Sequence, residues 1–441
     1  MDFDQQQLET IAGIALEKAK ALGATEAGVN VSQGAGFSVT GRLQDVETIE
    51  HHRDQGMGIT VYLNQQKGSA SSSDLSPAAV AETVSKACSL ASYAAKDDCA
   101  GLADPKRLAS SWPDLDLWHP WGISVVDAIA LSLECEAAAR AVDTRISNSE
   151  GATVSAAEGI SLYANSNGFM GVYPDSHHSV SCSVIAQEAD EMQRDYEYTA
   201  SRVPGELRGA AEVGQEAGLR TVQRLGSRKL DTRNTPVIFP ARLARGLFGH
   251  LVGAVSGGAL YRKSSFLLDS LGTHVLPEFI SITERPHIPR ALGSAPFDAE
   301  GVATYEHDLV RAGILESYVL ASYSARKLGK ESTGNAGGVH NLVVSHSDID
   351  FAGLLAQMDT GLLVTELMGQ GVNTVTGDYS RGAAGFWVEK GVIQYPVHEI
   401  TIAGNLKQMY SQIVAVANDV DLRGGIRSGS VLLETMTVAG S

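Results

Sequence analysis

The sequence is poor in cysteine. Its four cysteines, Cys88, Cys99, Cys135 and Cys182, are spread through a chain of 441 residues and form no Cys-x-x-Cys pair. This spacing argues against a disulfide-stapled scaffold and against a cysteine zinc knuckle. Free thiols are typical of proteins in a reducing compartment, so we expect a cytoplasmic protein.

Long hydrophobic runs are also absent. No apolar run reaches the roughly 20 residues that a membrane helix needs. The almost uncharged stretch at 246–260 has 15 residues, which as a helix would cover only about 22 Å. The first residues, MDFDQQQ, include acids where a signal peptide needs bases. We therefore expect neither a membrane span nor a signal peptide.

Basic residues are too few to balance the acidic ones. Lys and Arg total 34 against 51 for Asp and Glu, which gives a formal net charge of −17. Such a charge repels nucleic acid and anionic membranes unless the basic residues cluster. The densest basic groups, at 224–229 and 326–330, are short. Direct binding to nucleic acid or to a membrane is therefore not expected.

Hydrophobic periodicity in the first half predicts helices around a set of strands. Helical spacing is found at 5–22, 77–96, 124–143 and 205–226. Alternating segments between them predict strands, including a hairpin that turns at Asn64 to Lys67 and short strands separated by the turns NSEG, AAEG and NSNG. The segment 97–121 holds three prolines and three tryptophans and is predicted to be a loop across the surface.

The second half begins at PVIFP and is richer in glycine and in β-type segments. Helices are expected only at 240–256, 351–358 and 405–417. Because helices and strands are grouped and do not alternate, the pattern favours an α+β fold over a doubly wound parallel sheet. We predict two domains: residues 1–228, a helix-flanked β-sheet, and residues 229–441, a β-rich domain.

Most common signatures of active sites are missing. The sequence contains no GxxxxGK[ST] phosphate loop, no Gly-x-Ser-x-Gly elbow and no His-Glu-x-x-His zinc motif. The glycines of GQGVNTVTG (369–377) do not follow the dinucleotide-binding spacing. Two pairs of adjacent histidines, at 51–52 and 177–178, lie in strand-like segments, where neighbours point to opposite faces. Neither pair is expected to chelate one metal ion.

One histidine lies in an unusual setting. His250 is the one histidine in GLFGHLVGAVSGGAL (246–260). Each glycine in a helix costs up to about 1 kcal/mol relative to alanine, so a helix here needs a compensating reason, either close backbone packing or a ligand near the main chain. From composition alone, His250 is interpreted as a packed histidine before it is interpreted as a catalytic one.

The same stretch carries a family resemblance. The run GLFGHLVGAVSGGALYRKSSFLLDSLG, followed by SYSARKLG, ELMGQGVNTVTGDYSRGAAGFWVEKG, YPVHEITIAGN and SGSVLL, closely resembles the TldD/PmbA family over residues 230–441. The N-terminal half is similar in general character. The resemblance implies a cytoplasmic metalloprotease of two subunits, a TldD-type and a TldE-type, that trims peptide precursors and degrades poorly folded proteins such as an antitoxin. An older label for the family is modulator of DNA gyrase.

The resemblance also implies where a metal site would lie. In the TldD-type subunit, zinc is held by a His-Glu-x-x-x-His motif on a helix and by a later cysteine. In this sequence Gly249 and Ala254 fall at the two histidine positions, His250 at the glutamate and Ser428 near the cysteine. A serine hydroxyl is a poor zinc ligand compared with a thiolate. We therefore expect no metal in this chain and zinc in a TldD-type partner. We also expect the glycines at 253 and 257 to allow close packing of this helix.

A subunit without zinc can still bind the peptide. Asp378, Ser380 and Arg381, at the start of a β segment, and Arg262 are our candidates for substrate contacts. The alternatives are that Asp378 caps its own turn, that Arg381 pairs with an acid and that Arg262 is solvated. We expect a heterodimer with a TldD-type subunit or a homodimer. Two other functions stay open: an independently active peptidase with an unrecognised site, and a non-enzymatic modulator of DNA gyrase.

Overall fold

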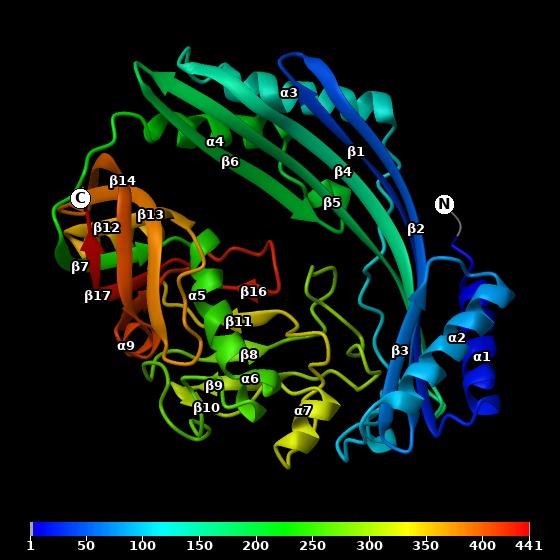
Figure 1. Cartoon of the computed structure of the whole chain (residues 1–441). Coiled ribbons are helices and arrows are strands. Elements are labelled where there is room, and N and C mark those ends of the chain that lie inside the picture. Colours follow the sequence, from blue (N-terminus) through cyan, green and yellow to red (C-terminus); the bar gives the residue numbers. More distant parts are fainter. Residues whose placement is uncertain (1–2, 441) are drawn as a thin grey trace.

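The N-terminal half is a single antiparallel sheet that arches over the rest of the molecule (Figure 1). The computed structural model describes residues 3–440. The sheet has six strands in the order β3-β2-β1-β4-β5-β6. Its strands are β1 (Glu26–Arg42), β2 (Asp45–Leu63), β3 (Gln66–Ser72), β4 (Ile146–Asn165), β5 (Met170–Glu188) and β6 (Glu191–Ser201). Its helices are α1 (Gln5–Ala21), α2 (Pro77–Tyr93), α3 (Val125–Arg140) and α4 (Ala210–Gln223).

The same pattern of elements occurs twice in this half. A helix, three strands and a second helix are followed by another helix, three strands and helix. The two units meet where β1 and β4 pair antiparallel, from Gly28↔Asn165 to Gly41↔Ala152. The strand order is therefore symmetric about this central pair.

Each end of the sheet has its own hydrophobic core. Helices α1 and α2 cover one end, where Leu8 and Val84 pack with Val29 of β1. Helices α3 and α4 cover the other end, where Val213 packs with Val154 of β4. The two cores have no residue in common.

Helices α1 to α3 were predicted within three residues. The helix predicted at 205–226 begins only at Ala210, because Pro204–Glu206 forms a separate 3-10 turn, and the strands are longer than predicted. The motifs NSEG and AAEG, predicted to be turns, lie inside the 20-residue strand β4. Gly151 of NSEG has φ +98° at a bulge, where the register shifts between Ser149 and Gly151. Gly159 of AAEG lies where a Cβ would be 3.2 Å from the carbonyl oxygen of Gln33. These glycines therefore bend the strand and admit its neighbour, and do not end it.

The C-terminal half contains two sheets, which confirms the α+β class. Strands β7 (Arg233–Phe239), β12 (Gly361–Met368), β13 (Asp378–Glu389), β14 (Val392–Asn405), β15 (Ile413–Val416) and β17 (Val431–Ala439) form the larger one. Because β14 also pairs with β17, five of these strands close on themselves. The smaller sheet contains β8 (Ile282–Glu284), β9 (His307–Arg311), β10 (Ile314–Leu315), β11 (Leu342–Val344) and β16 (Ile426–Arg427).

The helices of this half are short. They are α5 (Ala241–Ala254), α6 (Gly257–Tyr261), α7 (Ser322–Lys327), α8 (Phe351–Met358) and α9 (Leu406–Ser411). The prediction of one helix over 405–417 is wrong beyond Ser411, because Ile413–Val416 pairs with β17 as strand β15. The largest hydrophobic core of the chain lies between α5, α9 and the closed strands.

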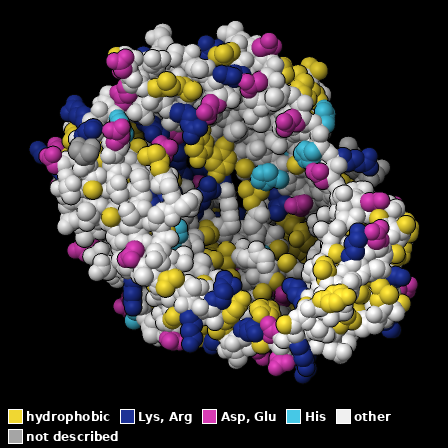
Figure 2. Space-filling model, in the orientation of Figure 1, with side chains coloured by type: hydrophobic (Ala, Val, Ile, Leu, Met, Phe, Trp, Pro, Cys, Tyr) yellow, Lys and Arg dark blue, Asp and Glu magenta, His cyan; other side chains and the backbone are white. Residues whose placement is uncertain are grey.

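The two halves are joined by ionic contacts and by the irregular segment 97–121. Arg326 of α7 donates to the carbonyl oxygens of Cys99, Gly101 and Leu102 at 2.7–2.8 Å. The segment contains one short 3-10 turn, Pro105–Arg107, and no strand of any of the three sheets. Figure 2 shows the face of the molecule hollowed at its centre, between the arch and the C-terminal half.

Two features expected from the sequence, free cysteines and the lack of a membrane-spanning helix, can be checked in the described residues. All four cysteines are free thiols. Within residues 3–440, no helix combines the length and the apolar character that crossing a bilayer requires.

Candidate functional site

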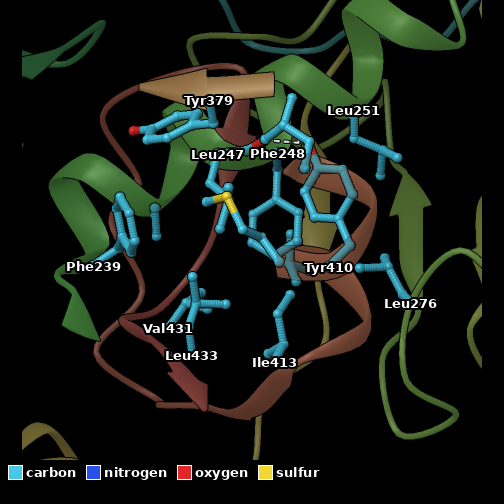
Figure 3. Packing of buried hydrophobic residues seen from close by; sticks show 14 of the residues in the cluster. Phe239, Leu247, Phe248, Leu251, Leu276, Tyr379, Tyr410, Ile413, Val431 and Leu433 are labelled. Carbon is cyan, nitrogen blue, oxygen red and sulfur yellow. Dashed lines mark hydrogen bonds between the residues drawn. The ribbon is translucent and has the colours of Figure 1, made fainter. Parts of the chain in front are cut away.

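Helix α5 carries the positions that resemble a zinc motif. It begins after Pro240, whose extended conformation (φ −62°, ψ 157°) ends β7 and leads into the helix. Leu247, Phe248 and Leu251 lie on its buried face, and Figure 3 shows them packed around Tyr410. The hydroxyl of Tyr410, fully buried on α9, donates a 2.9 Å hydrogen bond to the carbonyl oxygen of Leu247. The apolar stripe therefore fixes how α5 sits on the core.

The opposite face of α5 is a row of glycines. Gly246 and Gly253 are exposed, and a Cβ at either position would have no atom within 4 Å. Gly253 therefore packs closely against nothing in the described chain, and the prediction of close packing is not met there by the chain's own atoms. It is confirmed for Gly257 at the start of α6, where a Cβ would lie 2.2 Å from Oγ of Ser324. The sequence did not distinguish the two because both are glycines in one apolar run.

His250 is half-buried beside an aromatic ring and a cation. Its imidazole meets the ring of Tyr379 at a centroid distance of 6.0 Å. Burial, and then the positive charge of Arg381, hold the pKa of His250 below its usual value. Within residues 3–440, the ring of His250 has no hydrogen bond and no ion pair to a carboxylate. A neutral imidazole without an orienting acid lacks the partner that a general base normally has.

The remaining motif positions do not fit zinc. Gly249 and Ala254 have no ligand atom in their side chains, and Ala254 is fully buried. Ser428 is also fully buried, and its hydroxyl donates to the carbonyl oxygen of Gly429 at 2.8 Å. In the described part of the chain, no group of three or more His, Cys, Asp or Glu residues is arranged to hold a metal ion. The donor set therefore offers one imidazole where a structural or catalytic zinc needs three or four ligands.

The structure nevertheless brings the segment just before Ser428 close to α5. Ile426 of β16 lies close to α5, since its Cδ1 atom would be 3.9 Å from a Cβ at Gly249. Ser428 follows two residues later and pairs with Asp421 through an isolated bridge. The helix and the later segment are thus neighbours, as the resemblance implies.

Strand β13 supplies the cation beside His250. Tyr379 and Arg381 lie on one face of β13, and Asp378 and Ser380 on the other, because side chains alternate along a strand. Tyr379 is buried, and its pKa is raised to about 12 mainly by that burial. The guanidinium of Arg381 donates to the carbonyl oxygen of Leu367, and its Nε is buried without a partner. The alternative that Arg381 pairs with an acid is therefore wrong.

Asp378 is engaged within its own turn. Its carboxylate accepts hydrogen bonds from Thr376 Oγ1 (2.6 Å) and from Asn405 Nδ2 (3.2 Å), and these bonds lower its pKa. The edge of β13 here is covered by the preceding loop: the backbone N–H of Ser380 donates to Gly371. A peptide that pairs with β13 at this point would have to replace that loop.

Arg262 lies apart from these residues. It follows α6, is exposed, and stacks over the ring of Tyr261 at 5.2 Å. No contact joins Arg262 to His250, Tyr379 or Arg381. The structure therefore gathers His250, Tyr379 and Arg381 into one cluster and leaves Arg262 outside it.

An ionic network anchors the segment that ends at Ser428. Glu197 of β6 is buried, and Arg423 binds it across the boundary between the two halves. The same guanidinium donates two 2.9 Å hydrogen bonds to Asp421 and stacks over the ring of Tyr198. The N-terminal sheet therefore helps to position the loop before β16.

Tyr379 was missed by the sequence reasoning. The alternation in DYSRGAAG already places residue 379 on the same face as Arg381. The contact with His250 could not be foreseen, because it joins a helix and a strand that are far apart in the chain.

Comparisons with known proteins cover nearly the whole chain. Residues 27–91 match PmbA/TldA metallopeptidase domain 1, residues 118–225 the PmbA/TldA metallopeptidase central domain and residues 232–440 the PmbA/TldA metallopeptidase C-terminal domain. Metalloprotease PmbA of Escherichia coli O157:H7 is 51% identical over 440 residues, covering 100% of this chain and 98% of that protein. A PmbA homolog of Haemophilus influenzae is 49% identical, covering 99% of this chain and 97% of that protein.

Solved structures share the fold over its full length. A Bacteroides thetaiotaomicron protein described as a modulator of DNA gyrase superposes with a TM-score of 0.94 at 28% identity, covering 100% of both chains. TldE of Thermococcus kodakarensis superposes with a TM-score of 0.81 at 18% identity, covering 98% of this chain and 100% of that one. On the family matches and the full-length identities, this chain belongs to the PmbA/TldD family of metalloproteases.

Proposed function

We propose that this chain is the TldE-type subunit of a two-subunit cytoplasmic metalloprotease that cleaves unfolded peptides. In this role it binds no zinc and supports the active site and substrate channel of a TldD-type subunit. The observation that carries the proposal is the donor set at α5, where Gly249, Ala254 and Ser428 provide no zinc ligand and His250 has no acid beside it.

The cluster around His250 suggests what the chain contributes. Arg381 has a buried Nε atom without a partner, beside a neutral imidazole and a buried phenol. A guanidinium in that setting can donate to a peptide carbonyl or carboxylate. We assign Arg381 to peptide contact on the face of β13 that meets His250, and the exposed Ser380 to peptide contact on the opposite face. Asp378 shapes the turn that holds them, and Arg262 belongs to the outer rim.

The surface that binds a TldD-type subunit can also bind a second copy of this chain. Related subunits of a pseudo-symmetric dimer share an interface, so the chain can pair with a TldD-type subunit or, alone, with a second copy of itself. The heterodimer is the form we propose to be active, because one of its subunits retains the zinc ligands.

The decisive experiment measures zinc and cleavage together. The purified chain is analysed by mass spectrometry for zinc, and cleavage of an unfolded peptide is assayed for the chain alone and after mixing with a TldD-type subunit. We expect no stoichiometric zinc and cleavage only in the mixture. One zinc per chain with cleavage by the chain alone would overturn the proposal and favour an independent peptidase, which is what the name Metalloprotease PmbA of the E. coli relative suggests.

A second candidate function rests on the name of one structural relative. The Bacteroides thetaiotaomicron protein is described as a modulator of DNA gyrase. The net charge of −17 disfavours direct contact with DNA, so such a role would act through gyrase itself. Capture of gyrase by this chain in the absence of a TldD-type subunit would support it.

A further inference from the structure

Among the described residues, the half-buried side chain of Arg427 has no hydrogen-bond or ion-pair partner. Arg427 is the second residue of β16, and its Nε atom is buried without a hydrogen bond. Within residues 3–440, its guanidinium forms no ion pair. Buried polar groups in folded proteins are almost always paired, so this one calls for a ligand or a structural reason.

Arg427 lines a cavity of about 390 Å³, which we call the Arg427 cavity. Its other walls are the loop Arg285–Pro289 and Glu306. Arg285 and Glu306 pair at 3.1 Å, with half of each side chain exposed. Two guanidinium groups thus face one carboxylate, and the charge of Arg427 is left unbalanced. Burial and the nearby charge of Arg285 lower the pKa of Arg427, but an arginine stays protonated at neutral pH.

The walls of the Arg427 cavity are held in place. Pro286 and Pro289 have fixed φ angles. The carbonyl oxygen of Pro286 accepts from the backbone N–H of Ala295, and that of Ile288 accepts from the hydroxyl of Ser294. The Nε2 atom of His287 lies 2.9 Å from Oγ1 of Thr304, which fixes the ring. A ligand that enters therefore meets a preorganised wall and orders little of the protein.

The cavity adjoins the segment that contacts α5. Ile426 approaches Gly249, and the next residue of β16 is Arg427, whose side chain points to the opposite face of the strand. The Arg427 cavity and the motif helix therefore lie on the two sides of one short strand. Anything bound to Arg427 would be a few residues from the site where the TldD-type subunit keeps its cysteine.

We propose that the Arg427 cavity binds the C-terminal carboxylate of a peptide. The proposal rests on the proposed function, in which peptides are the substrates. The planar fork of a guanidinium matches the two oxygens of a carboxylate. Pro286, Ile288 and Pro289 offer an apolar wall for the side chain of the last peptide residue. Two guanidinium groups exclude a metal cation.

The volume is consistent with a small anionic group and its neighbour. Ligand pockets are usually about 300–1,000 Å³, and this cavity lies near the lower end of that range. Inorganic phosphate could also bind between two guanidinium groups, so the test has to separate a peptide end from a free anion.

The test uses the full-length chain without any partner. An N-terminally fluorescein-labelled pentapeptide of alanines ending in leucine is titrated by fluorescence anisotropy, as the free acid and as the C-terminal amide. We expect the free acid to bind at least tenfold more tightly than the amide. In Arg427→Gln the two forms should bind equally, whereas Arg53→Gln, which changes an exposed arginine of β2 outside the cavity, should leave the difference intact.

A second variant keeps the test informative if Arg427→Gln does not fold. Arg285→Gln changes a half-exposed residue at the rim, so the protein should fold, and we expect it to reduce the preference for the free acid several-fold. Equal binding of acid and amide by the wild type would overturn the proposal. Competition by inorganic phosphate with no preference for the free acid would overturn the peptide assignment in favour of a general anion site. These readouts need no proteolysis, so they can succeed or fail independently of the proposed subunit role.

Discussion

The imidazole of His250 meets the phenol ring of Tyr379 edge to face, with the ring planes at 76° and Arg381 close enough to disfavour a charge on the imidazole. This arrangement keeps the histidine neutral and leaves it without a carboxylate. The residue at the position of a catalytic glutamate is therefore part of a packed aromatic and cationic cluster.

Replacing His250 tests whether it takes part in the chemistry. We expect His250→Ala to retain cleavage by the mixture with a TldD-type subunit within a few-fold of wild type, because no acid or metal partners the ring. The measurement is kcat/KM for an unfolded peptide at a fixed ratio of subunits. A complete loss of cleavage with normal folding and normal subunit association would show that His250 is catalytic.

The same histidine should affect stability at low pH. Its pKa in the folded chain is lower than its unfolded value of about 6.5. Protons therefore bind more readily to the unfolded chain, and the contribution of the neutral ring is fully present above pH ~6.5 and is lost as pH falls through the folded pKa. Urea unfolding of wild type between pH 5 and 7.5 should show this loss, together with those of His177, His178 and His287, whose pKa values are also lowered.

The matched variants are His250→Gln and His346→Gln. The first should reduce the pH dependence of the unfolding free energy, because glutamine does not titrate. His346 is exposed, so its replacement should leave the profile unchanged. Identical profiles for all three proteins would contradict the role assigned to burial at position 250.

Arg381 and Asp378 are expected to differ although they are three residues apart. Arg381→Gln should raise KM for peptide cleavage in the mixture severalfold, with a smaller change in kcat, because its guanidinium has an unused donor beside the cluster. Asp378→Asn should change KM less than twofold, since its carboxylate is already bonded to Thr376 and Asn405. Steady-state kinetics of both variants measure this difference in KM. An equal rise in KM for the two variants would contradict the prediction.

The glycines of the α5 region offer a paired stability test. Gly257→Ala should destabilise the chain by roughly 1–3 kcal/mol, because its Cβ would collide with Ser324. Gly253→Ala should be neutral or stabilising by up to about 1 kcal/mol, because the position is open and alanine favours a helix. Denaturant unfolding of both variants gives their free energies of unfolding and tests this contrast. Destabilisation of the isolated chain by Gly253→Ala would refute the geometry.

Arg423 should be important for the junction between the two halves. Arg423→Ala removes the contacts to Glu197, Asp421 and Tyr198, and leaves the buried Glu197 with Arg208 and Arg220. We expect a loss of about 2–4 kcal/mol. Arg311→Ala breaks only a surface pair with Asp308 and should cost less than about 1 kcal/mol. Thermal unfolding compares them, and similar small losses would show that the junction is held by other contacts.

Elements with strong periodicity were predictable. Helices α1 to α3 begin at recognisable side-chain caps, such as Ser76 before Pro77, whereas α4 begins after Gly209 without one. The two long strands β1 and β4 were broken up in the prediction, because a glycine inside a strand has the same local signature as a glycine in a turn. What distinguishes them is the neighbouring strand, which is remote in sequence.

The candidate site was predictable as a set of positions but not as a set of contacts. The resemblance placed Gly249, His250 and Ser428, and local spacing placed Arg381. Whether Arg381 meets an acid or a histidine depends on how β13 packs against α5, and no local pattern records that. The unpartnered side chain of Arg427 could not be predicted for the same reason, because the sequence GGIRSGS does not indicate which residues lie opposite its arginine.

The repeated helix, three strands and helix of the N-terminal half has a consequence for how its cores are built. The two units are joined along the β1–β4 pair, which runs from Gly28↔Asn165 to Gly41↔Ala152. Each core takes residues from both units: Ile160 and Leu162 of β4 pack in the core under α1 and α2, and Val39 of β1 packs in the core under α3 and α4. Neither unit therefore completes its hydrophobic core without strand residues of the other.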